Sequence, residues 1–214
     1  PEGMEDRFEH LPLECSHLYL AIEGKLAAVI CVEDPLREEA ADAVRELKEA
    51  GITKVVMMTG DSERTAAAIA KRVGVDEYYS EVLPEDKASF VEKEKELGHK
   101  VIMIGDGIND SLALSSASVG IAISDGAAIA REIADVTISA DNLHEIVTLK
   151  RLSTALMKRI HNNYRTIIGI NGGLIALGVT GIIMPTTSAL LHNMSTLTIS
   201  LRSMRNLLPK EEEA

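Results

Sequence analysis

The sequence of 214 residues predicts an α/β domain with a parallel β-sheet covered by helices on both faces, followed by a transmembrane helical hairpin. Over the first three quarters of the chain, short unbroken apolar runs alternate with amphipathic helical patterns. This alternation is typical of a parallel sheet that is buried on both faces. In the last quarter, no Asp, Glu, Lys or Arg occurs between Ile167 and Ile199, which favours a membrane segment.

Three amphipathic helices are expected in the first part of the chain, each with a glycine where the helix should stop. Glycine takes the left-handed backbone that commonly ends a helix. Asp61 or Ser62 caps the second helix, and Pro84 opens the third. The predicted ranges are 37–52, 61–75 and 83–98, which stop at Gly51, Gly74 and Gly98.

The expected strands are short and mostly apolar. Residues 17–37 form two strands around a turn at Glu23–Gly24. The other strands are predicted at 54–61, 100–107, 118–124 and 134–139, with a helix over 126–134 between the last two. In a parallel sheet the carboxyl ends of the strands share one rim, where ligands bind. The polar corners TGD (59–61) and GDG (105–107) are therefore expected at the same edge of the sheet.

A basic amphipathic helix is predicted over 142–166, before an uncharged run over 167–184. At about 1.5 Å per residue this run is roughly 27 Å long, close to the thickness of a bilayer core. Pro185 ends it, and a second uncharged run covers 186–201. Basic residues flank both outer ends, which places them in the cytosol by the positive-inside rule. A buried, water-soluble hairpin is the alternative.

Composition excludes some functions. The formal charge of −11, the 3% aromatic content and the absence of Trp argue against nucleic-acid binding. Cys15 and Cys31 do not form a CxxC pair, and we interpret them as buried thiols in a reducing compartment.

The polar corners carry the residue types that phosphoryl transfer needs. A hydroxyl at Thr59 and a lysine at Lys87 suit phosphate oxygens, while carboxylates at Asp106 and Asp110 suit Mg²⁺. Gly105 and Gly107 allow close backbone approach. Each of these residues alone is weak evidence for a phosphoryl-transfer site. A single lysine such as Lys87, for example, is usually an ordinary surface residue.

The stretches MMTGDSERTAAAIAKRVGV, LPEDK and GDGINDSLAL resemble the phosphorylation domain of heavy-metal (transition-metal) transporting P-type ATPases, which belong to the haloacid dehalogenase superfamily. The resemblance covers nearly the whole chain. EDPLREEAADAV resembles the return from the nucleotide-binding domain of that family, and the C-terminal hairpin resembles its last two membrane helices. It implies a haloacid dehalogenase-like, Rossmann-type fold.

The resemblance also implies roles for individual residues. Thr59 and Lys87 contact the phosphoryl group, Asp106 binds Mg²⁺, and Asn109 and Asp110 organise that site, with Asp110 as a second candidate ligand. The expected catalytic residues are Thr59, Gly60, Asp61, Lys87, Asn109 and Asp110.

In the hairpin, the resemblance implies polar groups along an ion path. The candidates are Asn171, His192, Asn193, Ser195 and Thr196. His192 suits Zn²⁺ and similar ions, although a helix–helix hydrogen bond is an equally good interpretation. The transported ion is expected to belong to the Zn²⁺, Cd²⁺, Co²⁺ or Cu⁺ class, and the bilayer is an expected partner. Two departures from the family pattern are Leu112, where a Pro is usual, and Arg202, where an Asn is usual.

No Asp-Lys-Thr-Gly-Thr stretch, which carries the phosphorylated Asp in that family, occurs in this chain. Asp34 is interpreted as a turn residue. Together with the start at Pro1, this predicts the C-terminal fragment of an ATP-driven exporter in the plasma (inner) membrane. The nucleophile, most of the ATP site and the earlier membrane helices would lie upstream.

The expected organisation has four parts. A cytoplasmic phosphorylation domain (1–150) and a connecting helix (151–165) precede two transmembrane helices (166–205) and a cytoplasmic tail (206–214). The alternatives are a phosphatase of the same superfamily and a catalytically inactive, membrane-anchored partner of a complete pump.

Overall fold

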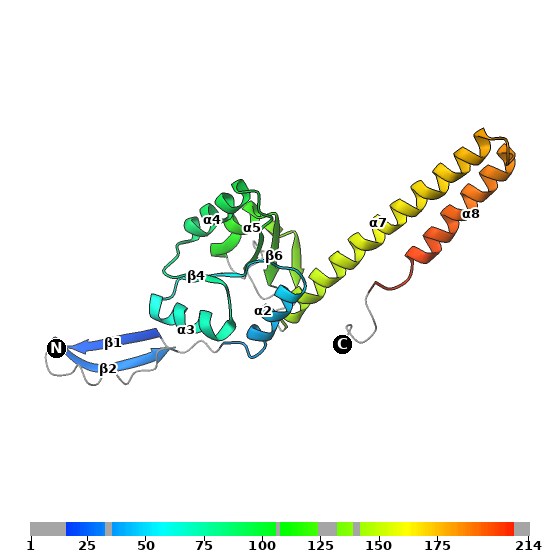
Figure 1. Cartoon of the computed structure of the whole chain (residues 1–214). Helices are drawn as coiled ribbons and strands as arrows, with labels where there is room; N and C mark the ends of the chain where they lie inside the picture. Colours follow the sequence, from blue (N-terminus) through cyan, green and yellow to red (C-terminus); the bar gives the residue numbers. More distant parts are fainter. Residues whose placement is uncertain (1–15, 33–35, 106–107, 124–131, 139–141, 208–214) are drawn as a thin grey trace. The chain divides into compact units, whose positions relative to one another are not determined.

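A computed structural model describes residues 16–32, 36–105, 108–123, 132–138 and 142–207 (Figure 1). The chain divides into two compact units, 1–147 and 148–214. The first unit holds the strands and short helices, and the second holds most of a long helical hairpin. The predicted helix at 126–134 and the positions of Cys15, Asp34, Asp106 and Gly107 lie largely or wholly outside the described residues.

The first two strands form an antiparallel hairpin, as predicted. β1 (Ser16–Ile22) pairs with β2 (Lys25–Val32), and the register shifts between Leu20 and Ala21. The turn residues Glu23 and Gly24 both have positive φ, at 49° and 78°. This backbone matches the twist of two-residue hairpins, in which glycine is favoured.

The next elements alternate helix and strand. They are α2 (Ala40–Glu49), β3 (Val56–Met58), α3 (Glu63–Val73) and β4 (Glu77–Tyr79). β3 and β4 are parallel, α3 contacts β4, and α2 contacts α3. Gly74 ends α3 with a φ of 77°, as its position in the sequence predicts. Strand β4 was not predicted.

A second parallel sheet follows, in the order β5–β6–β7. Its strands are β5 (Ile102–Gly105), β6 (Val119–Ile123) and β7 (Val136–Ile138). Helix α4 (Pro84–Glu96), the short 3₁₀ turn η1 (Ile108–Asp110) and α5 (Ser111–Ser116) complete this part of the unit. Helices α4 and α5 contact each other, and α5 contacts β5 and β6 (Figure 1).

One apolar core joins these elements. The buried cluster draws Ala88 and Val91 from α4, Leu114 from α5, and Met103 and Ala122 from the sheet. The side chain of Met58 in β3 packs against the same cluster. The strand ends that carry the polar corners are thus anchored in one core, as the predicted parallel fold requires.

The second unit consists mainly of two helices, α7 (His144–Val179) and α8 (Pro185–Ser203). The predicted connecting helix and the start of the uncharged run form one continuous helix, α7. The expectation that the helix continues over the whole run 167–184 is wrong, because α7 ends at Val179. Gly181 has a φ of 73°, and Gly181 and Ile182 donate to the carbonyls of Gly178 and Leu177, which is the Schellman pattern that ends helices.

The sequence predicts two membrane-spanning helices in this region. Among the residues that the structure describes, no helix is both long enough and apolar enough to cross a membrane.

Candidate functional site

The centre of the candidate site is an ion pair between two of the predicted residues. Lys87 Nζ donates to Asp110 Oδ1 at 2.8 Å, although the residues are far apart in the sequence. Their side chains are only 16% and 11% exposed. Lys87 lies in the first turn of α4, and Asp110 ends the 3₁₀ turn that follows β5. A largely buried carboxylate requires such a partner, because desolvating an unpaired charge is costly.

Gly105, the last residue of β5, has no room for a side chain. A Cβ at this position would lie 2.6 Å from the Cβ of Asp110 and 2.8 Å from its Oδ2. The sequence predicted a need for close backbone approach here. The close neighbour in the structure is the Asp110 side chain, so Gly105 fixes where this carboxylate sits.

The second polar corner is a closed loop after β3. Thr59 Oγ1 donates to Asp61 Oδ2 at 2.6 Å and accepts from the Asp61 N–H at 3.1 Å. Ser62, rather than Asp61, caps α3, and its hydroxyl accepts from the Thr65 N–H. The loop therefore presents a threonine hydroxyl and an aspartate together, immediately before a capped helix.

Backbone hydrogen bonds connect this loop to the segment that leads into α4. The N–H of Glu81 donates to the carbonyl of Asp61 at 2.9 Å, and that of Val82 donates to the carbonyl of Thr59 at 3.0 Å. Two residues after Val82, α4 begins at Pro84 and brings Lys87 to Asp110. The structure thus joins the TGD corner to the Lys87–Asp110 pair through a short, hydrogen-bonded segment.

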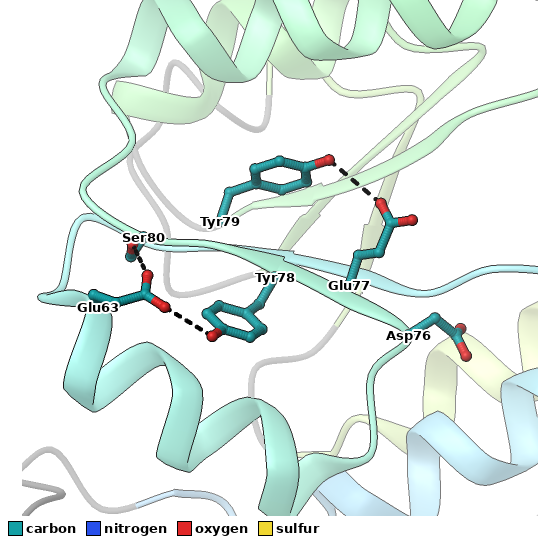
Figure 2. A pocket seen from close by; sticks show the side chains of 6 residues that line it. All are labelled: Glu63, Asp76, Glu77, Tyr78, Tyr79 and Ser80. Carbon is teal, nitrogen blue, oxygen red and sulfur yellow. Dashed lines mark hydrogen bonds between the residues drawn. The ribbon is translucent and has the colours of Figure 1, made fainter.

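Glu63, which sequence reasoning missed, ties α3 to strand β4. Figure 2 shows its carboxylate accepting from the hydroxyls of Tyr78, at 2.8 Å, and Ser80, at 2.5 Å. These bonds from Ser80 and Tyr78 lower the pKa of Glu63, and the same contact raises the pKa of Tyr78. The three residues line a shallow pocket of about 530 Å³ with Asp76, Glu77 and Tyr79. None of the predicted site residues lines it.

Two further ion pairs hold the far end of β3 and β4. Lys48 donates to Asp76 and to the carbonyl of Gly74, while the Val55 N–H donates to the other oxygen of Asp76. The contacts from Lys48 and Val55 lower the pKa of Asp76. A hydrogen bond from Lys54 lowers the pKa of Glu77. These carboxylates serve the packing of α2, α3 and β3.

The remaining predicted residues of the soluble site are only partly placed. Asn109 is exposed beside the buried Asp110, and Gly60 has open space around it. Within the described ranges, no group of three or more His, Cys, Asp or Glu side chains is placed to hold a metal ion. Asp106, the expected Mg²⁺ ligand, lies outside those ranges.

The hairpin brings two of the predicted ion-path residues into contact. His192 Nδ1 lies 2.9 Å from Asn171 Oδ1, so α7 and α8 share a polar contact. The hydroxyls of Ser195 and Thr196 donate to the backbone carbonyl of His192 within α8. Asn193 is exposed. Of this predicted set, only Asn171 and His192 join the two helices.

Comparison with known proteins identifies the class. Residues 2–118 match the haloacid dehalogenase-like hydrolase family, so the chain belongs to that family. The polar strand ends, the parallel strands and the Lys87–Asp110 pair are in keeping with it.

Within this class, the chain is similar in sequence to heavy-metal P-type ATPases. It is 37% identical over 189 residues to a zinc-exporting P-type ATPase of Mycobacterium marinum, covering 88% of this chain and 26% of that protein. It is 44% identical over 176 residues to copper-transporting ATPase 2 of Rhizobium meliloti, covering 82% of this chain and 21% of the other.

Solved structures give the same relationship. A zinc-transporting PIB-type ATPase in the E2.Pi state aligns with a TM-score of 0.82 at 30% identity, over 97% of this chain and 33% of that one. The chain therefore spans about a quarter of the length of the curated relatives it matches.

Proposed function

We propose that this chain is the C-terminal part of an ATP-driven transition-metal exporter that works through an aspartyl-phosphate intermediate. The observation that carries the proposal is the largely buried Lys87–Asp110 pair, which joins α4 to the 3₁₀ turn after β5 and is linked by a hydrogen-bonded segment to the TGD corner. Relatives named as zinc-exporting, manganese-exporting and copper-transporting ATPases support it. Because the named metals differ among these relatives, we propose a transition-metal ion as the transported ion and name no particular metal.

The sheet supports a nucleophile supplied from upstream. Among the described strands, β3 pairs only with β4, and β5 pairs only with β6. Met58 of β3 and Met103 of β5 nevertheless contribute to one core. Two unpaired edges over a shared core favour the insertion of a further strand, because exposed strand edges present unpaired N–H and C=O groups. We propose that this strand brings the phosphorylated aspartate to the rim formed by Thr59 and Asp110.

Each residue then has a role in phosphoryl transfer. The hydroxyl of Thr59 and the ammonium of Lys87 hold phosphate oxygens, and Asp61 orients Thr59 through its 2.6 Å hydrogen bond. Gly60 leaves the loop open for the phosphate, and Asn109 is exposed, so a ligand can reach this residue. Catalysis by such a site is mostly positioning and charge stabilisation.

Mg²⁺ fits this donor set in part. Oxygen ligands suit this ion, but Asp110 Oδ1 already accepts from Lys87. We therefore propose Asp106 as the main ligand, with Asp110 contributing one oxygen while it orients Lys87. When bound, Mg²⁺ neutralises the charge that develops on the transferred phosphoryl group. ATP is bound mainly by the upstream part of the pump.

We also propose that the α7–α8 hairpin lies in the plasma (inner) membrane, packed against other helices of the pump, with the first unit and the C-terminus in the cytoplasm. Large apolar side chains are exposed along both helices, among them Ile168, Ile175, Leu190 and Leu197. Polar groups within the apolar region pair with each other, as Asn171 does with His192, which reduces the cost of placing them in lipid. We propose the polar set around His192 as part of the ion path.

The soluble site is tested in the complete pump by measuring acid-stable phosphoenzyme formed from ATP. Asp106→Ala should abolish phosphorylation because the Mg²⁺ site loses its main ligand. Glu85→Gln, an exposed change on the same helix as Lys87, is the matched control and should leave phosphorylation intact. Full phosphorylation of Asp106→Ala would refute the Mg²⁺ assignment.

Two further assays separate the other candidates. A free-standing phosphatase would hydrolyse phosphate esters with this chain alone. A catalytically inactive partner would leave the metal-stimulated ATPase of a pump unchanged when Asp106 or Lys87 is replaced. The exporter proposal predicts neither result.

The hairpin is tested by cysteine labelling in membrane vesicles with a reagent that does not cross the bilayer. Single cysteines at Ile175 and Leu197 should be protected, and one at Lys158 should be labelled from the cytoplasmic side. Equal labelling at all three positions would contradict the membrane placement. His192→Ala should change the dependence of ATPase activity on metal, and an unchanged metal profile would leave His192 with a packing role only.

A further inference from the structure

The end of α8 is held by an arginine from α7. One Nη atom of Arg159 donates to the carbonyl of Ser203 at 3.0 Å and also to that of Arg205, while the other donates to the carbonyl of Asn206 at 2.9 Å. Arg159 is half-buried, whereas its neighbour Lys158 is exposed. Three backbone carbonyls at the end of one helix therefore converge on one guanidinium of the other.

This arrangement matches the needs of a helix end. The last carbonyls of a helix have no partner within the helix and carry a partial negative charge. Arginine presents several donors in a fixed planar fork and keeps its charge. At the C-cap of α8, the Met204 N–H donates to the carbonyl of Leu201, and the Arg205 N–H donates to that of Arg202. The carbonyls contacted by Arg159 lie on both sides of this cap: Ser203 is the last residue of α8, and Arg205 and Asn206 follow Met204.

A second contact lies one turn further along α7. Asn163 Nδ2 donates to Ser203 Oγ at 2.7 Å, and Ser203 Oγ donates in turn to the carbonyl of Ile199. Asn163 therefore binds the side chain of Ser203, and Arg159 binds the backbone carbonyl of the same residue. Closer to the turn of the hairpin, the same antiparallel register places Asn171 against His192.

We propose that Arg159 clamps the C-terminal end of α8 and sets the register of the hairpin, so that His192 stays opposite Asn171. The clamp itself is a structural inference, and its consequence for metal handling rests on the proposed function. Apolar contacts between helices in lipid give little preference for one register, because lipid tails are as apolar as the side chains. Directional bonds at the open end of the hairpin supply that preference. Arg159 is thus a positioning residue for the proposed ion path.

The clamp is tested by hydrogen exchange of the full 214-residue chain in detergent micelles, read by mass spectrometry. Arg159→Gln should raise amide exchange in the last turn of α8 by about tenfold, since hydrogen bonds to a charged group are worth on the order of a factor of ten. Arg159→Lys keeps the charge and loses the fork, so most of the increase should remain. Lys158→Gln removes the same charge next to it and should change nothing.

The register is tested by cross-linking. In a chain that carries Cys15→Ser and Cys31→Ser, cysteines at Asn171 and His192 should be joined readily by a short bifunctional thiol reagent, because the longer wild-type side chains meet at 2.9 Å across the two helices. Adding Arg159→Gln should lower the initial rate several-fold, and adding Lys158→Gln should not. Unchanged amide exchange at the end of α8 in Arg159→Gln would overturn the clamp, as would an equal increase in Lys158→Gln. An unchanged cross-linking rate in Arg159→Gln would overturn the role of Arg159 in setting the register of α7 against α8. Both readouts are structural, so a pump that proved inactive would leave them unaffected.

Discussion

Replacing Gly105 with alanine should displace the carboxylate at the centre of the candidate site. The new Cβ would lie 2.6 Å from Asp110 Cβ, 2.9 Å from its Cγ and 2.8 Å from its Oδ2. Carbon atoms in folded proteins pack at about 3.5–4.0 Å. Asp110 must therefore move, and its neighbours limit that movement because it is buried at the start of α5.

The expected cost follows from these contacts. Overpacking a close-packed site costs about 1–3 kcal/mol. The upper half of that range applies if the shift also lengthens the 2.8 Å bond between Lys87 and Asp110, because hydrogen bonds to charged groups contribute about 1.5–3 kcal/mol each. We expect Gly105→Ala to lower the free energy of unfolding of the first unit by about 2 kcal/mol.

Urea unfolding followed by tyrosine fluorescence measures this change, since Tyr78 and Tyr79 both lie in β4 of the same unit. Gly60→Ala is the matched control. It makes the same substitution in the other polar corner, where nothing lies within 4 Å of the added Cβ. Its unfolding free energy should stay within about 0.5 kcal/mol of wild type. A Gly105→Ala protein as stable as Gly60→Ala would refute the inferred crowding at Asp110.

Three further predictions concern other contacts. Gly120→Ala should lower the free energy of unfolding by about 1–3 kcal/mol, because the added Cβ would lie 2.6 Å from the Leu114 carbonyl oxygen. An unchanged midpoint of urea unfolding would argue against this close packing. Lys87→Met and Asp110→Asn should show a coupling energy of about 0.5–3 kcal/mol in a double-mutant cycle, whereas additive effects would mean that the pair is not formed. The hydrogen bonds that lower the pKa of Glu63 stabilise the folded state above the ordinary carboxyl pKa, and this stabilisation is lost as the pH falls through the lowered pKa. The free energies of unfolding of Glu63→Gln and wild type should therefore converge below about pH 4. A difference that stays constant with pH would contradict the contact of Glu63 with Tyr78 and Ser80.

The parallel strands and the polar corners at their ends could be predicted because their signals are local. Apolar runs ending in TGD and GDG marked β3 and β5, and Gly74 ends α3 where its position suggested. Strand β4 could not be found this way, because it has three residues and begins with a charged glutamate. Such a segment is too short to show a period of two and takes its structure from pairing with β3.

The end of α7 shows a different limit of sequence reasoning. The apolar residues Ile182, Ile183 and Met184 extend the uncharged run, so hydropathy alone continued the predicted helix. The backbone instead turns at Gly181, where positive φ and two hydrogen bonds to α7 carbonyls end the helix. The Lys87–Asp110 and Arg159–α8 contacts join residues far apart in sequence, which no local pattern encodes.

We propose that this chain supplies the phosphate-binding part of the phosphorylation site of a pump whose nucleophile lies upstream. Acid-stable phosphoenzyme formed from radiolabelled ATP tests it most directly, with the complete pump and the 214-residue chain compared at equal concentration. Label should appear on the complete pump and not on this chain alone. Label on the isolated chain would contradict it, because the chain would then contain its own phosphorylated residue.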